Sequence, residues 1–184
     1  LLPFAAAAQA PVQPLRIGVL VMEPGEVFFE RFGHIAILVQ DRAAGTSTSY
    51  NYGFFDPEEA GFVGNFVRGR MMYYLIPLPL SDDLAQYRDE GRGVTVQWLD
   101  LSPAQAQSMA HDLEVNALPQ NRRYRYDYYL DNCSTRVRDM LDRALGGALK
   151  PQLAGRSRET TPIALRRIPS AVERSSPMTG SCPL

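Results

Sequence analysis

The sequence predicts an α+β domain in which helices pack on an antiparallel sheet. Segments with the period of a strand come early in the chain, whereas the two longest helical patterns come late, with short helical segments interposed. The expected strands cover residues 16–22, 34–40, 47–52, 71–77 and 94–101. The expected helices cover part of 81–93, then 102–118 and 132–145.

The clearest strand is expected at residues 34–40. Gly33 gives a tight entry, and Ile35, Ile37 and Val39 then alternate with the other side chains. This is the pattern of a strand that is buried on at least one face.

The next two strands are less regular. Residues 47–52 are rich in Ser, Thr and Tyr, and Thr and Tyr favour strands. The strand at 71–77 is expected to break at Pro77 and Pro79, because proline cannot donate to a strand ladder.

Each expected helix has a residue suited to cap its start. Ser81 precedes the short helix, and Ser102 precedes the longest one, with Pro103 in its first turn. Asp131 or Asn132 can cap the last helix.

Cys133 lies in the first turn of this last helix. The unpaired N–H groups and the positive end of the helix dipole favour a thiolate there, and Arg136 and Arg138 add positive charge. A second interpretation is a small buried hydrophobe one turn before Val137. The residues around Cys133 leave both interpretations open.

A nucleophilic thiol needs a base, and the chain has two histidines, His34 and His111. His34 is the first residue of its expected strand, where its side chain can meet the start of a helix. His111 lies in the amphipathic helix at 102–118 and is most simply a surface residue. His34 is therefore the candidate base for Cys133.

Several motifs now carry a resemblance to a known family. They are, in chain order, FGHIAILV, YNYGFF, FVRGRMMYYL, QWLDLSPAQ and RYRYDYYLDNCSTRVRD. Together they resemble the N-terminal periplasmic domain of the bacterial lipoprotein N-acyltransferase Lnb, over about residues 30–147. That family in turn resembles the circularly permuted papain-like hydrolases and acyltransferases, including NlpC-type peptidases.

The resemblance implies a permuted papain-like fold with the nucleophilic cysteine at a helix N-terminus. In that fold the histidine strand precedes the cysteine helix, as His34 precedes Cys133. It also implies a polar residue on the strand after the histidine, which holds the imidazole in one orientation. Asn51 is the matching residue, and Ser49, Tyr50 and Tyr52 are its rivals.

Further residues are assigned around this expected site. Tyr52, Arg136 and Tyr126 are expected to contact the substrate. Asp131 is expected to cap the helix, and Asp127 to pair with an arginine, because a free carboxylate would oppose the thiolate.

The resemblance implies exported, cysteine-dependent acyl transfer through a thioester on Cys133. The donor would be a phospholipid or lipoprotein acyl chain, and the acceptor a lipoprotein N-terminal amine, so the partners can include a membrane surface. Two alternatives remain open: a peptidoglycan or peptide amide hydrolase, and a non-catalytic binding domain of the cell envelope.

Composition excludes other classes of function. A net charge of −1 gives no strong attraction to nucleic acid. The chain has no metal-ligand spacing motif and no nucleotide-binding glycine motif, so no metal and no cofactor are expected. Cys182 lies in a Pro- and Ser-rich tail, and we do not expect a structural disulfide with Cys133.

Three segments are expected along the chain. Residues 1–15 resemble the end of a secretory signal peptide followed by a linker, with a start inside a linker as the alternative. Residues 16–150 form the domain, and residues 151–184 form a tail that is poorly ordered or truncated. The chain as given has no run of apolar residues long enough to span a membrane. We therefore expect an exported protein of the periplasm or cell envelope.

Overall fold

The computed structural model describes residues 14–27, 30–56, 58, 61, 64–65 and 68–154. Within this part of the chain, six antiparallel strands form one sheet in the order β5-β1-β2-β3-β4-β6. The strands are β1 (Leu15–Met22), β2 (His34–Asp41), β3 (Thr46–Phe54), β4 (Met72–Pro79), β5 (Val94–Trp98) and β6 (Arg123–Arg125). The helices are α2 (Leu80–Asp89), α3 (Pro103–Ala117), α4 (Cys133–Ala144) and α5 (Leu149–Ala154). The α+β class expected from the sequence is confirmed, whereas the permuted papain-like arrangement stays a prediction.

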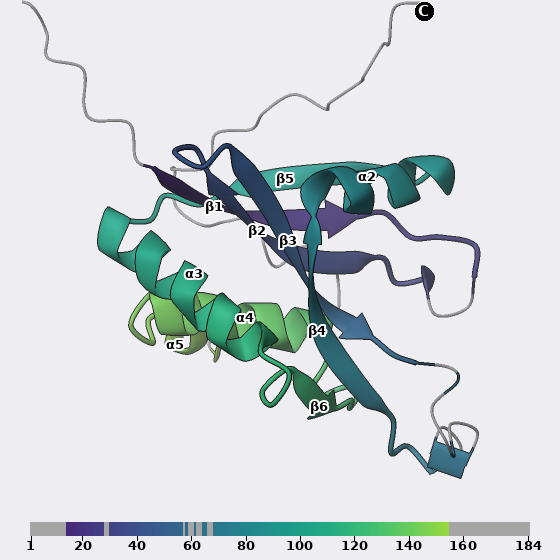
Figure 1. Cartoon of the computed structure of the whole chain (residues 1–184). Helices are drawn as coiled ribbons and strands as arrows, with labels where there is room; N and C mark the ends of the chain where they lie inside the picture. Colours follow the sequence, from purple (N-terminus) through teal and green to yellow (C-terminus); the bar gives the residue numbers. More distant parts are fainter. Residues whose placement is uncertain are drawn as a thin grey trace, which may run out of the picture.

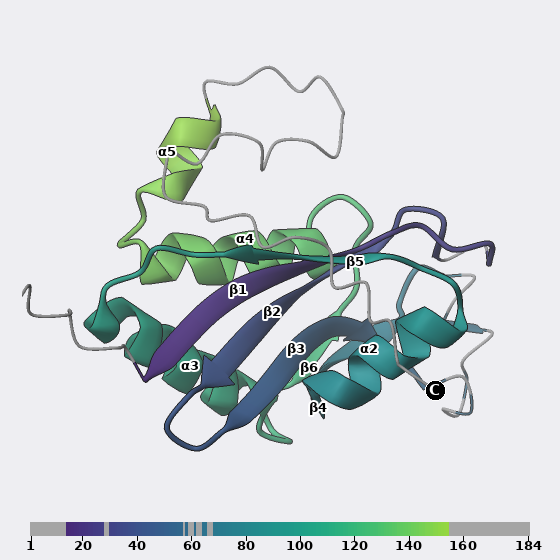
Figure 2. The same ribbon diagram turned by 90° about the horizontal axis from the view of Figure 1, so that it is seen from above.

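Helices cover both faces of the sheet (Figures 1 and 2). The larger core lies between the sheet and the pair α3 and α4, and it contains Ile17, Ile37, Leu113 and Val137. A smaller core lies on the other face under α2, where Tyr87 packs with apolar side chains of β1 and β2. Along β2, odd-numbered residues therefore face α3 and α4, and even-numbered residues face α2.

Strand β4 does not break at its prolines, contrary to expectation. It stays paired with β3 through Pro77 and Pro79. The N–H of Leu75 points away from β3 and donates to the carbonyl of Arg122 at 2.9 Å. The direction of the backbone nitrogen alternates along a strand, so the nitrogens of Pro77 and Pro79 point away from β3, as that of Leu75 does. They lie past the end of β6, and the missing N–H groups therefore cost no hydrogen bond to β3.

The helix starts partly match the expected caps. Ser102 caps α3 in a capping box with Gln105, and Pro103 is its first residue, as expected. Ser81 does not cap α2: the helix begins at Leu80, and the Ser81 hydroxyl donates to Asp82.

Two short elements were not expected from the sequence, namely β6 and α5. Helix α5 crosses the expected boundary between domain and tail at residue 150. The leader segment up to residue 13, the rest of the tail and Cys182 lie outside the described residues.

Candidate active site

Cys133 is the first residue of α4, and Asn132 caps this helix. The Asn132 side chain accepts from the N–H of Thr135 at 3.0 Å, and the Thr135 hydroxyl accepts from the N–H of Asn132 at 2.8 Å. This reciprocal cap fixes the first turn, so the thiol is held at the positive end of the helix dipole.

The sulfur of Cys133 is partly buried and surrounded by hydrogen-bond donors. The backbone N–H groups of Ile35 and Ser134 lie near enough to lower the pKa of the thiol, and the Ser134 hydroxyl lies 4.0 Å from the sulfur. Burial nevertheless raises the pKa of the Cys133 thiol above its ordinary value, although these hydrogen bonds lower it in part. Burial therefore opposes the thiolate that the start of the helix was expected to favour.

His34 begins β2 and is held by a buried chain of polar groups. Its Nε2 lies 3.1 Å from Oδ1 of Asn51, a residue that is 1% exposed. The Asn51 amide donates to the Asp83 carboxylate at 3.0 Å and to the Ser49 hydroxyl at 3.2 Å. Because Asp83 can only accept, the Asn51 oxygen faces the imidazole, Nε2 carries the proton, and Nδ1 is free to accept one.

The imidazole of His34 is neutral at physiological pH. Burial lowers its pKa below the ordinary value, more than the Asn51 bond and the charge of Asp83 raise it, and Arg92 lowers it further. Neutral imidazole is the form that a general base needs.

His34 and Cys133 approach the start of β2 from opposite faces of the sheet. The imidazole lies on the α2 face with Asn51 and Asp83, whereas the thiol lies on the α3/α4 face, against the N–H of Ile35. Among the hydrogen bonds of the described residues, none joins His34 to Cys133. The sequence led us to expect direct contact, and the structure instead brings the thiol to the residue next to His34.

The space beside the imidazole depends on Gly53. Its φ of 115° lies in the left-handed region, at the point where the pairing of β3 with β4 shifts register. A Cβ at this position would lie 3.8 Å from Cε1 of His34. A larger side chain there would restrict the movement of the ring.

Asp131 and Asp127, which precede α4, each take the kind of partner that was expected for the other. Asp131 pairs with Arg136 through two hydrogen bonds, of which Nη2 to Oδ2 is 2.6 Å long. Asp127 accepts from the N–H groups of Tyr129 and Leu130 and so closes a tight turn. The thiol thus has no unpaired carboxylate from either residue beside it.

The three expected substrate residues are placed differently from one another. Tyr52 is buried, and its hydroxyl donates to Asn116 at 2.7 Å. Arg136 lies over the ring of Tyr124 at 4.2 Å, and Tyr126 stacks on Tyr73 with ring centroids 4.3 Å apart.

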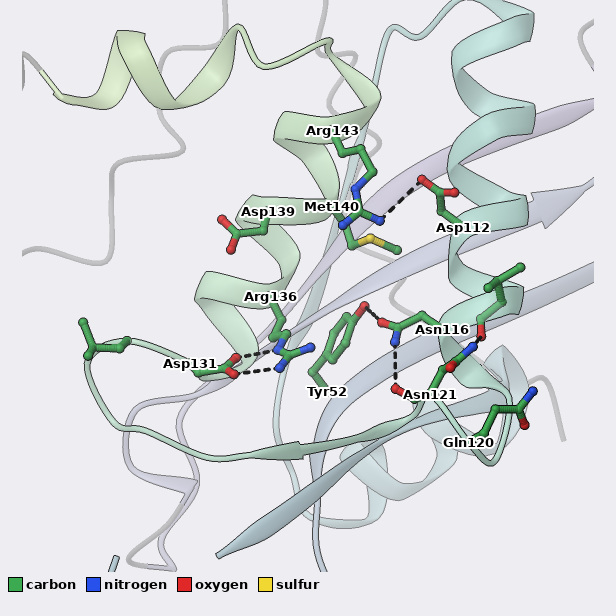
Figure 3. Close-up of a pocket in the computed structure, with 12 residues that line it drawn as sticks. Tyr52, Asp112, Asn116, Gln120, Asn121, Asp131, Arg136, Asp139, Met140 and Arg143 are labelled. Atoms are coloured by element: carbon green, nitrogen blue, oxygen red, sulfur yellow. Dashed lines mark hydrogen bonds and ion pairs between the residues drawn. The ribbon is translucent and has the colours of Figure 1, made fainter. Parts of the chain in front are cut away.

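Tyr52 and Arg136 line an open polar cleft of about 690 Å³ between α3 and α4 (Figure 3). Asn116, Asn121 and Arg143 also contribute to its walls, and the Arg143 guanidinium lies 3.7 Å from Asp112. Cys133, His34 and Tyr126 are not among the lining residues. The cleft lies one helical turn along α4 from Cys133, so it neighbours the thiol and does not enclose it.

The comparison with protein families decides the family of the chain. Residues 5–170 match the model of the Lnb N-terminal periplasmic domain. The chain belongs to this family. Neither the curated proteins nor the solved structures contain a match.

The exported location expected from the sequence is confirmed, since this Lnb domain family is periplasmic. In the part of the Lnb domain that the structure describes, no helix has the length and apolar character needed to cross a bilayer. The same residues contain no group of His, Cys, Asp or Glu side chains that could hold a metal ion.

Two features of the Lnb domain escaped sequence reasoning. Asp83 anchors the Asn51 amide from α2, although it lies 32 residues away in the sequence. The hydroxyl of Tyr124 is buried without a hydrogen-bond partner. Burial raises the pKa of Tyr124, and the negative charge of a Cys133 thiolate would raise it further. An isolated carboxylate in an amphipathic helix and one tyrosine among many gave no local signal for either role.

Proposed function

We propose that this Lnb domain catalyses acyl transfer through a thioester on Cys133. The donor is an ester-linked acyl chain of a phospholipid, and the acceptor is the N-terminal amine of a lipoprotein. The supporting observation is the placement of Cys133: its sulfur lies at the start of α4, near backbone N–H donors that include Ile35, the residue that follows His34.

The first half-reaction forms the thioester. His34 takes the Cys133 proton on Nδ1 while the sulfur attacks the ester carbonyl carbon, and the carbonyl oxygen becomes an oxyanion. The N–H groups around the sulfur, with the unpartnered hydroxyl of Tyr124, are suited to stabilise that charge. The ester C–O bond then breaks, and the imidazolium returns its proton to the leaving alcohol.

The second half-reaction releases the enzyme. The acceptor amine attacks the thioester carbonyl, His34 takes a proton from the amine nitrogen, and the C–S bond breaks. The Cys133 sulfur leaves as a thiolate, takes the proton back from His34, and an amide remains on the acceptor. If water attacked in place of the amine, the same residues would carry out hydrolysis.

The reaction requires a turn of the imidazole. Because the Cα–Cβ bond of a strand residue points to one face, the imidazole can reach the thiol only if the backbone at the start of β2 also shifts, and this breaks the bond to Asn51 for that interval. Gly53 leaves room beside the ring. Apo geometry with long or absent catalytic hydrogen bonds is common and does not exclude a base.

A non-catalytic binding domain is the second candidate. The observation that favours it is the same polar chain, because Asn51 and Asp83 hold the imidazole away from Cys133. In that case Cys133 is a partly buried hydrophobe, and the raised pKa of its thiol has no further consequence.

A soluble activated ester separates these functions. The domain is incubated with p-nitrophenyl butyrate, and intact-mass spectrometry follows an adduct that hydroxylamine removes. We expect the adduct on wild type and none on Cys133→Ala. His34→Ala should slow its formation by about 10²–10⁴, whereas the matched control His111→Ala should not.

The acceptor is then varied. A peptide with a free N-terminal amine should discharge the adduct faster than its N-acetylated copy if the domain is a transferase. Equal discharge would identify a hydrolase. Absence of any adduct on wild type would leave the binding domain as the function.

A further inference from the structure

Two loops of the described chain meet in a cluster of exposed apolar side chains, which we call the aromatic tip. It consists of Phe32, Tyr128, Tyr129 and Leu130, with exposed fractions of 71%, 52%, 81% and 78%. The ring of Tyr128 contacts those of Phe32 and Tyr129 edge-on, at centroid distances of 5.8 and 5.0 Å. Such a grouping is rare on the surface of a soluble domain and marks an interaction site.

The aromatic tip lies close in the sequence to both candidate catalytic residues. Phe32 is two residues before His34, and Leu130 is three residues before Cys133. Leu130 also lines the cleft beside α4, next to Asp131, which Figure 3 labels. Whatever contacts the tip is therefore brought near the thiol.

The loop that carries most of the tip satisfies its own backbone. Asp127 and Asp131 exchange two backbone hydrogen bonds of 2.9 and 3.1 Å, and the Asp127 carboxylate accepts from the N–H groups of Tyr129 and Leu130. The carbonyl of Tyr128 accepts from the Asn132 side chain at 2.7 Å. The loop can therefore leave water without exposing these polar groups to an apolar medium.

We propose that the aromatic tip inserts into the headgroup region of a phospholipid bilayer and docks the domain with Cys133 facing the lipid. Tyr and Phe prefer the membrane interface, where their rings contact acyl chains and a tyrosine hydroxyl stays in water. Exposed Arg31 and Arg125, which adjoin the two loops, complement the lipid phosphates. The charged carboxylate of Asp127 at the base of the turn limits insertion to this shallow depth.

A lipid surface fits the tip better than a protein partner does. The backbone donors that a protein would use for recognition are already taken within the loop, and the side chains offer apolar area with few hydrogen bonds. The proposal extends the proposed function by naming the surface at which the acyl donor is met. The test measures membrane binding alone. Membrane binding can therefore fail while a soluble ester still acylates Cys133, and acylation can fail while the domain still binds the membrane.

The test uses sedimentation with vesicles of phosphatidylethanolamine and phosphatidylglycerol, and with vesicles of phosphatidylcholine. Tyr129→Ser/Leu130→Ser should weaken partitioning of the whole chain by about tenfold or more. The matched control is Val115→Ser/Leu118→Ser, which removes two other exposed apolar side chains at the end of α3. It should bind as the wild type does.

Insertion is measured directly with Tyr129→Trp. Lipids brominated on the acyl chain should quench fluorescence in this variant beyond any quenching of the native Trp98, and should add none in the control Leu118→Trp. The proposal is overturned if the wild type does not sediment with either vesicle type, or if binding needs anionic lipid and Tyr129→Trp stays unquenched. A dimer in sedimentation velocity that the double variant abolishes, without vesicle binding, would overturn it in favour of a second copy of this chain.

Discussion

The Asn51 amide donates a hydrogen bond to the Asp83 carboxylate at 3.0 Å, and this bond determines which tautomer the imidazole of His34 adopts. With its NH₂ group committed to Asp83, Asn51 can only accept from His34. A helix on one face of the sheet thus sets which nitrogen of the histidine is basic.

Asp83→Asn should disturb that arrangement. An amide at position 83 can donate as well as accept, so Asn51 is free to turn over and the His34 tautomer is no longer fixed. ¹⁵N NMR of the imidazole should show a smaller share of the Nε2–H form, and Cys133 acylation by a soluble ester should slow by at least about tenfold. Asp82→Asn, on the exposed side of α2, is the control. An unchanged tautomer in Asp83→Asn would contradict the assignment.

Acid should destabilise the domain through His34. Its pKa is lowered by folding, so the unfolded chain binds more protons than the folded one between the folded pKa and about 6.5. The stabilising contribution is complete above about pH 6.5 and is lost as pH falls towards the folded pKa. Urea unfolding across this range should give a steeper loss of free energy for wild type than for His34→Gln. Parallel slopes would show that His34 is not buried in the neutral form.

Alkylation of Cys133 should require a higher pH than that of a free thiol. The reactive species is the thiolate, and burial raises the pKa of this thiol. The rate of reaction with iodoacetamide, followed by peptide mass spectrometry, should have its midpoint above about 8.5. Cys182 serves as the internal reference in the same chain. A midpoint for Cys133 near neutral pH would mean that the imidazole already faces the thiol in solution.

Tyr124→Phe should separate stability from activity. The hydroxyl of Tyr124 is buried and unpartnered, so its removal should leave the free energy of unfolding unchanged or raise it by about 1 kcal/mol. If the hydroxyl stabilises the oxyanion, acylation of Cys133 should nevertheless slow by about 10²–10³. Tyr73→Phe, in the neighbouring ring, is the control. Equal rates for the two variants would exclude this role for Tyr124.

The sheet and the main helices could be predicted because their patterns are local. Alternation gave the strands, and Ser102 with Pro103 gave the start of α3. Strand β6 has three residues and forms because its partner β4 is present, so its own sequence carries no period. The capping role could not be assigned between Asp131 and Asn132, since either side-chain oxygen can accept from a helix N–H and only the Arg136 pairing decides.

The facing of His34 could have been read from the sequence. Ile35 and Ile37 face α3 and α4, and side chains alternate along a strand, so His34 must face α2 on the other side of the sheet. Asn51 as the partner of the imidazole was implied by the family resemblance, and in the structure His34 and Asn51 lie on adjacent strands and share a face. Asp83 could not be found this way, since only the packing of α2 on the sheet brings it there.

The two prolines of β4 also affect whether one molecule can add a strand to the sheet of another in a crowded compartment. Beyond β6, the outer edge of this strand offers carbonyl groups, while at Pro77 and Pro79 it has no N–H to offer. A strand from another molecule could not complete a ladder there, so this edge resists aggregation by sheet extension. An exported chain that folds beside many others is thus protected along the β4 edge of its sheet.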